Sequence, residues 1–287
     1  MGLAAGDAVG TTVEFKPRGS FAPVTDMVGG GPFRLEAGQW TDDTSMALCL
    51  ATSLVECRGF DAKDQMDRYV RWSEGGYLSS TGRCFDIGGT VRGARARYRR
   101  TGDPFAGSTD RNQAGNGCIM RLAPVPMWFY PDIESMAHHA AESSRTTHGT
   151  AECLDACRLL ARILHRAFEG QSKEDVLFAD AAFSGAPKIQ SIARGSYRDT
   201  SRDAVRGSGY VVDSLEAALW CVWTTDTFEA AILEATNLGD DADTTAAVAG
   251  QVAGALYGIE GIPARWREKV AMRELIVELA DRLRQVR

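Results

Sequence analysis

Two short acidic segments, WTDDT at residues 40–44 and GDDADT at residues 239–244, each stand directly before an apolar stretch. An ordinary helix N-cap needs only one Asp, Ser or Thr, because a single side-chain oxygen accepts a free N–H at the helix start. For the first segment alone, capping is the common use of such residues. The second segment supplies three aspartates and a threonine, more than a cap requires. Carboxylate and hydroxyl oxygens are ligands that Mg²⁺ and Mn²⁺ prefer, so two such helix starts can meet and hold two metal ions.

A third segment, residues 2–15, ends in a further carboxylate. Its glycines Gly2, Gly6 and Gly10 recur every four residues and so fall on one face of a helix. Such a face lets a neighbouring backbone approach closely. Glu14 follows it and is available as a metal ligand or a base; the alternative is an ordinary solvated glutamate at a helix end.

Glycines also mark two places where a ligand can bind. Gly115, Asn116 and Gly117 form a glycine-rich loop, and the backbone N–H groups of such loops can hold a diphosphate. The same three residues are also a plain turn signal. His148 stands between Thr147 and Gly149, before an apolar stretch, where a capping or core histidine is the alternative to a functional one.

The elements that must position these residues are predicted to be helices. Apolar residues recur at three- and four-residue spacing in six stretches, and alternating runs of β-branched residues are nearly absent. We therefore expect an all-α fold, a compact bundle of many helices that forms one domain over residues 1–287. Residues 185–209 lack an apolar period and are expected to be a long surface connection. The expected helices are residues 45–56, 151–168, 214–223, 228–235, 244–257 and 266–283.

The composition narrows the class of protein. Of the 287 residues 44% are hydrophobic, which is enough to bury a sizeable core, and the net charge of −6 argues against a general nucleic-acid binder. The seven cysteines form no CxxC pair, and we expect no signal peptide, so reduced thiols are expected rather than a disulfide framework. Since no run approaches the roughly 18 apolar residues of a membrane helix, we expect no membrane span. We expect a cytoplasmic monomer that binds no nucleic acid.

Seven motifs, in this order, resemble those of the ADP-ribosylglycohydrolase family. The resemblance runs from Met1 to about residue 258, and within the family it is strongest to the members that reactivate dinitrogenase reductase. The motifs are GLAAGDAVGTTVEF, WTDDTSMAL, STGRCFDIGGTVR, GNGCIMRLAPVP, THG, SGYVVDSLEAALW and LGDDADTTAAVAGQVAGALYG.

The resemblance implies a role for individual residues. The two acidic segments would hold two divalent cations, Mg²⁺ or Mn²⁺, and Asp240 would take no part. Glu14 would lie beside the metals, and Asp86 near the scissile bond on the side of the ribose away from them. Gly115, Asn116 and Gly117 would hold the ADP-ribose, with His148 at the same pocket and Tyr210 stacked on the adenine. The metal ligands would be Thr41, Asp42, Asp43, Asp241, Asp243 and Thr244.

The implied reaction is hydrolysis of the N-glycosidic bond between ADP-ribose and an arginine of a mono-ADP-ribosylated protein, with ADP-ribose as product. Either Asp86 or Glu14 would be the acid/base carboxylate. Two alternatives stay open, namely hydrolysis of another ADP-ribosyl linkage (serine or a small molecule) and a non-catalytic relative that binds ADP-ribose. If the two helix starts share a two-metal site, Asp42 and Asp243 must lie within about 10 Å of each other.

Overall fold

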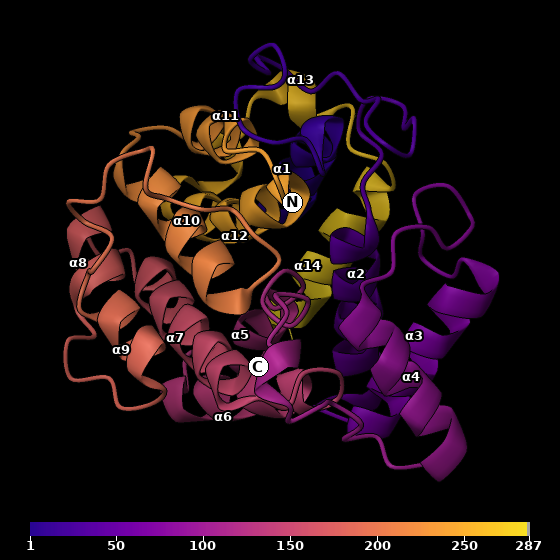
Figure 1. Ribbon diagram of the computed structural model, residues 1–287. Helices are drawn as coiled ribbons and strands as arrows, with labels where there is room; N and C mark the ends of the chain where they lie inside the picture. The colour runs from indigo at the N-terminus through magenta and orange to yellow at the C-terminus, as the bar shows by residue number, and fades with distance from the viewer. Residues whose placement is uncertain (286–287) are drawn as a thin grey trace.

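The computed structural model describes residues 1–285, and in this range the chain forms fourteen α-helices joined by loops (Figure 1). Strand pairing within the described range is limited to isolated single bridges. The helices are α1 Gly2–Gly10, α2 Asp42–Cys57, α3 Ala62–Gly75, α4 Gly89–Thr101, α5 Pro124–Phe129, α6 Ile133–Arg145, α7 Ala151–Phe168, α8 Lys173–Phe178, α9 Pro187–Ala193, α10 Val211–Trp223, α11 Phe228–Asn237, α12 Ala242–Gly261, α13 Ala264–Arg267 and α14 Arg273–Gln285.

Helices α1 and α12 lie side by side near the centre of the molecule (Figure 1). The glycines of α1 face the backbone of α12, as their spacing predicts. A Cβ atom added at Gly6 would lie 2.1 Å from the carbonyl oxygen of Ala246, and one added at Gly2 would lie 2.2 Å from that of Gly250. Any side chain at these positions would therefore push the two helices apart.

The remaining helices pack around this pair. α10, α11 and α7 contact α12, while α14 and α3 contact α2. One hydrophobic core reaches from Ala4 in α1 to Leu283 in α14, which confirms a single domain built from many helices. A second, smaller core joins α2, α3 and α4 around Tyr69 and Trp72.

Residues 185–209 are not only a surface connection, contrary to the sequence prediction. They contain α9, and Ile189, Ile192, Tyr197 and Val205 are all buried in the main core. Apolar residues in this segment are too sparse to give a clear period, but each of these four finds a place in the core. The segment is therefore part of the packed structure.

The predicted helix at residues 266–283 is interrupted. α13 ends at Arg267 and α14 begins at Arg273, with Met272 in the left-handed region at φ 55°. The residues between the two helices bond to a distant loop, since the N–H of Ala271 donates to the carbonyl of Gly38 at 2.9 Å. These tertiary bonds replace the helical ones. The other five predicted helices are present.

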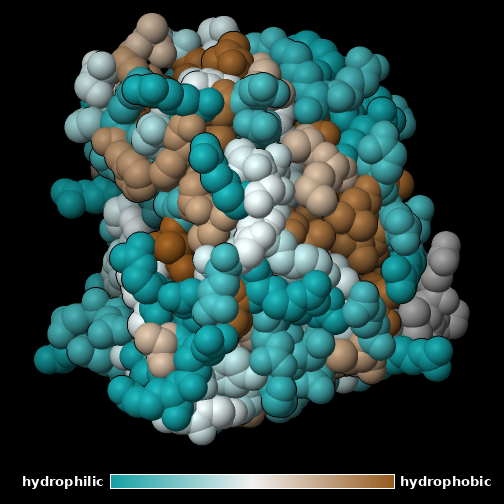
Figure 2. Space-filling model, turned by 90° about the vertical axis from the view of Figure 1, so that its right-hand side faces the viewer, coloured by the Kyte–Doolittle hydropathy of each residue, from teal (hydrophilic) through white to brown (hydrophobic). Residues whose placement is uncertain are grey.

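The face shown in Figure 2 is mostly polar, and its broadest hydrophobic patch lies on the right-hand side of the view. None of the helices within residues 1–285 combines the length and the apolar character needed to cross a membrane.

Candidate active site

The two acidic helix starts meet in the folded chain. Carboxylate oxygens of Asp42, Asp43 and Asp243 lie within 4.8 Å of one another, and all three side chains are buried. The expected convergence of the N-termini of α2 and α12 is thereby confirmed. Glu14 and Asp86 join Asp243 in a second group with the same spacing. We call Glu14, Asp42, Asp43, Asp86 and Asp243 the acidic cluster.

Asp42 and Asp43 are not needed to cap α2, because a residue of α1 caps this helix instead. Thr41 stands at the N-cap position, yet its side chain makes no capping bond. Instead Asp7 of α1 accepts bonds from the N–H groups of Thr41 at 2.9 Å and Thr44 at 3.0 Å, and from both hydroxyls. Asp7 is fully buried and was missed in the sequence analysis. The signal was present, because Asp7 is the one charged residue in a helix otherwise made of glycine and apolar residues.

Hydrogen bonds within the protein leave the acidic cluster short of partners. The hydroxyl oxygen of Thr41 lies 2.9 Å from Asp7, and 3.2 Å from an oxygen of Asp43 and of Asp243. It carries one proton, so it can donate to only one of the three at a time. In the described chain, Asp43 Oδ1 and Asp243 Oδ1 are buried without any hydrogen-bond partner. Buried anions without partners are costly, and divalent cations supply the missing charge.

The electrostatics agree with this requirement. Burial and then neighbouring carboxylates raise the pKa values of Asp42, Asp43 and Asp243 well above the usual range. Since the donor atoms of the acidic cluster are carboxylate oxygens, hard cations such as Mg²⁺ or Mn²⁺ fit them. The residues present therefore suit the two metal ions that the sequence predicts.

Two further predicted ligands lie at the edge of the acidic cluster. Asp241 is half-buried, and its Oδ2 accepts a hydrogen bond from the side-chain amide of Asn116 at 2.9 Å. Thr244 is buried, and its hydroxyl interacts with Asp43. Asp240, which was left out of the predicted ligands, is exposed, and its carbonyl accepts a bond from the N–H of Phe15 at 2.7 Å.

The two candidate acid/base residues are neighbours. Burial, followed by the charges of Asp86 and Asp241, raises the pKa of Glu14 to about 10. Burial raises the pKa of Asp86 to about 6. Asp86 adopts a left-handed backbone with φ 48°, and its carboxylate lies beside Asp243. The sequence analysis expected Asp86 on the side of the ribose away from the metal segments, so its observed position beside Asp243 differs from that expectation.

The glycine loop pairs with the segment before α10. The N–H of Asn116 donates to the carbonyl of Gly209 at 3.1 Å, and Gly115 forms a single bridge with Tyr210. The Tyr210 hydroxyl donates to Glu152 at 2.7 Å, and Lys188 lies 4.8 Å from the ring centroid. The structure therefore brings Gly115, Asn116, Gly117 and Tyr210 together, with Asn116 linking them to Asp241.

The buried ring of His148 packs against the glycine loop. Its side chain is buried, and a Cβ atom added at Gly117 would lie 2.9 Å from the ring. Nδ1 is 2.8 Å from the hydroxyl of Thr147, and burial lowers the pKa of His148 to about 4. At neutral pH the ring is uncharged. Its position, in contact with both glycines, indicates that it fixes the shape of the loop.

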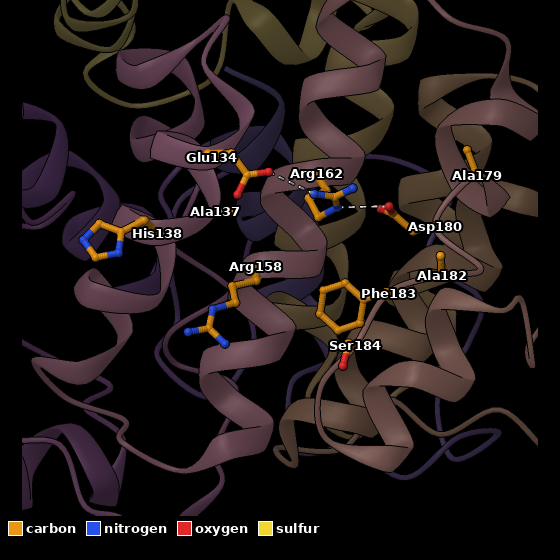
Figure 3. Close-up of a pocket in the computed structure, with 10 residues that line it drawn as sticks. All are labelled: Glu134, Ala137, His138, Arg158, Arg162, Ala179, Asp180, Ala182, Phe183 and Ser184. Carbon is orange, nitrogen blue, oxygen red and sulfur yellow. Dashed lines mark hydrogen bonds and ion pairs between the residues drawn. The ribbon is translucent and has the colours of Figure 1, made fainter.

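A separate cavity of about 490 Å³ opens between α6, α7 and residues 179–184 (Figure 3). Arg162 crosses it, 3.0 Å from Asp180 and 4.0 Å from Glu134. His138 and Arg158 also line the cavity, but no residue of the acidic cluster does. We therefore assign no part of the chemistry to it.

Comparison with known proteins agrees with this geometry. The sequence pattern of the ADP-ribosylglycohydrolase family matches residues 1–287. The chain is 50% identical to the ADP-ribosylarginine hydrolase Tri1 of Pseudomonas putida (strain GB-1) over 283 residues, 99% of this chain and 76% of that protein. It is 34% identical to the ADP-ribosyl-(dinitrogen reductase) glycohydrolase of Rhodospirillum rubrum, over 95% of this chain and 89% of that one.

A solved structure also matches. It is an ADP-ribosylglycohydrolase-related protein complex, with a TM-score of 0.88 and 43% sequence identity, covering 99% of this chain and 95% of the other. The family pattern spans the whole sequence, and both relatives exceed 30% identity over most of their length. The chain therefore belongs to the ADP-ribosylglycohydrolase family and is a hydrolase.

Proposed function

We propose that the protein hydrolyses the bond between ADP-ribose and an arginine side chain of a modified protein, and that it needs two divalent cations to do so. The observation that carries this proposal is the buried acidic cluster, with two carboxylate oxygens left without partners, linked through Asn116 to the glycine loop. The linkage to arginine is supported by the names of the relatives at 46–50% identity, both ADP-ribosylarginine hydrolases.

The cations would be held by Asp42, Asp43 and Asp243, with Thr41, Asp241 and Thr244 completing the ligands. When bound, they would supply positive charge that orients the ribose hydroxyls and stabilises the transition state. Asp7 would not bind the cations itself. It would position the ligands, because its four hydrogen bonds fix Thr41 and Thr44 at the start of α2.

The chain's own groups would bind the substrate and move the proton. Backbone N–H groups of the loop at Gly115 and Gly117 would hold the diphosphate, and Tyr210 would stack on the adenine. Glu14 or Asp86 would take the proton of the attacking water or hold the guanidinium in its protonated form, which leaves more readily. Both carboxylates lie within the acidic cluster, beside a carboxylate that would hold the cations.

The compartment belongs to the same proposal. All seven cysteines are free thiols, which suits a reducing compartment such as the cytoplasm. We propose that the protein acts there as a monomer, on an ADP-ribosylated protein that it releases together with free ADP-ribose.

The test is release of ADP-ribose from arginine-linked and serine-linked peptides, each measured with Mn²⁺ and with a chelator. We expect release from arginine only, and only with metal present. Asp243→Asn should lose most of its activity, because it removes a charge at constant volume. The matched control is Asp240→Asn, an exposed neighbour that should keep full activity. Faster release from the serine-linked peptide would show that the proposed substrate is wrong. If neither peptide releases ADP-ribose, the protein is better explained as a non-catalytic relative that binds ADP-ribose.

A further inference from the structure

Three phenylalanine rings from separate loops meet beside the acidic cluster. The ring of Phe33 lies 5.2 Å from that of Phe85 and 6.4 Å from that of Phe15, with interplanar angles of 54° and 78°. Tilted and edge-to-face contacts of this kind are arrangements that aromatic pairs prefer. We call these three residues the phenylalanine cluster.

The phenylalanine cluster is not part of the hydrophobic core. Phe15 is 64% exposed, the highest fraction among the large hydrophobic side chains that the structure describes, and Phe33 and Phe85 are half-buried. Phe15 also has φ 62°, a left-handed backbone that is rare for a bulky residue. The bond from its N–H to the carbonyl of Asp240, at 2.7 Å, holds it there. The protein thus fixes an apolar ring in solvent, where burial in the core offers no compensation.

The phenylalanine cluster is joined directly to the two candidate acid/base residues. Glu14 precedes Phe15 and Asp86 follows Phe85 in the chain. Because the carboxylates of Glu14 and Asp86 lie within 4.8 Å of each other, the backbone segments that carry Phe15 and Phe85 both run past the acidic cluster. The pairing of the glycine loop with Tyr210 involves other segments altogether. The glycine loop is bonded to the edge of the acidic cluster through Asn116 and Asp241, and the phenylalanine cluster is joined to it through Glu14 and Asp86. If ADP-ribose lies on the glycine loop, the phenylalanine cluster is available to the leaving group.

We propose that the phenylalanine cluster recognises the arginine side chain that carries the ADP-ribose. This inference rests on the proposed function. A guanidinium is a planar, weakly hydrated cation that stacks on aromatic faces. The methylene groups of arginine can cover the exposed ring of Phe15, and carboxyl oxygens of Glu14 and Asp86 can accept hydrogen bonds from the guanidinium. A serine-linked substrate offers neither a cation nor a methylene chain, so the rings would favour arginine.

The test replaces each ring by leucine, in Phe15→Leu, Phe33→Leu and Phe85→Leu, which keeps an apolar side chain and removes the aromatic face. For an ADP-ribosyl-arginine peptide we expect KM to rise by about 3- to 30-fold, the factor that a cation–π contact is worth, with kcat changed less. The dissociation constant of free ADP-ribose should stay within about twofold, which also shows that each variant folds. Phe60→Leu is the matched control, since this half-buried ring contacts His139 instead.

The outcomes of this test separate the inference from the proposed function. If the unsubstituted enzyme releases nothing from the arginine peptide, both are wrong. If it is active but the three leucine variants keep its KM, only the role of the phenylalanine cluster is refuted. An equal loss of affinity for ADP-ribose and for the peptide would also refute that role, because the rings would then contact the nucleotide.

Discussion

Replacing Gly6 by alanine tests whether the backbone contact between α1 and α12 positions the active site. The added Cβ atom would lie 2.1 Å from the carbonyl oxygen of Ala246 and 2.6 Å from its carbonyl carbon. Ordinary contacts are longer than 3.0 Å, so the helices must separate by about 1 Å or distort. Both atoms that the new methyl group meets belong to a backbone, which cannot move aside as a side chain does.

Two opposing contributions set the change in the free energy of unfolding of Gly6→Ala. Alanine favours a helix over glycine by about 0.5–1 kcal/mol. Overpacking a dense interior costs about 1–3 kcal/mol and more where the backbone must shift. The backbone must shift here, so the overpacking cost lies at its upper end. After the gain in helix preference, Gly6→Ala should lower the free energy of unfolding by roughly 2–2.5 kcal/mol, and Tm by about 2–4 °C for each kcal/mol. Mn²⁺ affinity should fall as well, because α1 carries Asp7 and α12 carries Asp243.

The matched control is Gly93→Ala in α4, where the nearest atom to an added Cβ is the tip of Arg97 at 3.6 Å. There the helix preference acts alone, so this variant should be more stable than the parent by about 0.5–1 kcal/mol. Chemical denaturation and Mn²⁺ titration calorimetry measure both quantities. A Gly6→Ala protein as stable as the Gly93→Ala protein would show that the two helices are not in backbone contact.

Three further predictions concern single side chains. Asp7→Asn should lower Mn²⁺ affinity by about 10- to 100-fold, because whichever way the amide faces, one buried N–H of Thr41 or Thr44 loses its acceptor; unchanged affinity in calorimetry would contradict this. Asp86→Asn should lower turnover by roughly 10²–10⁴-fold, with the affinities for metal and for ADP-ribose nearly unchanged. If this variant loses metal instead, Asp86 is a ligand and Glu14 is the better candidate for the base. Glu14→Gln would then test that role. Burial lowers the pKa of His148 from 6.5 to about 4, so the unfolded chain takes up a proton first as the pH falls. The free energy of unfolding present above pH 6.5 should therefore fall by about 2–3 kcal/mol by pH 4.5. In His148→Asn, the plot of unfolding free energy against pH should be flatter in this range. If the two plots are identical, His148 is not the source of the loss.

Helices with a dense apolar period could be predicted from the sequence, and those with a charged surface could not. The predicted range 151–168 coincides with α7, which buries eleven of its residues along one face. α4 buries only Val91, Ala94 and Tyr98 among many arginines, so its period was hidden. The break before α14 arises from bonds to Gly38, more than 200 residues away, and no local pattern carries such information.

Much of the acidic cluster was predicted because its residues stand at helix starts in unusual number. The position of Asp86 was not, since it depends on a left-handed residue in a loop between α3 and α4. Asp7 was missed because its role is to cap a helix far along the chain. His148 was placed at the right loop, but only the packed structure shows that it lies beneath the glycines.

The contact between α1 and α12 also sets the order of events during synthesis. α1 is made first, and α12 begins only at Ala242, roughly 230 residues later. At the usual pace of translation α1 must wait roughly 10–50 s for its partner. During that time its alanine and glycine face has nothing to pack against, and Asp7 can hold the start of α2 only loosely. The nascent chain therefore has no complete acidic cluster until α12 has been made, and the enzyme becomes competent only after that point.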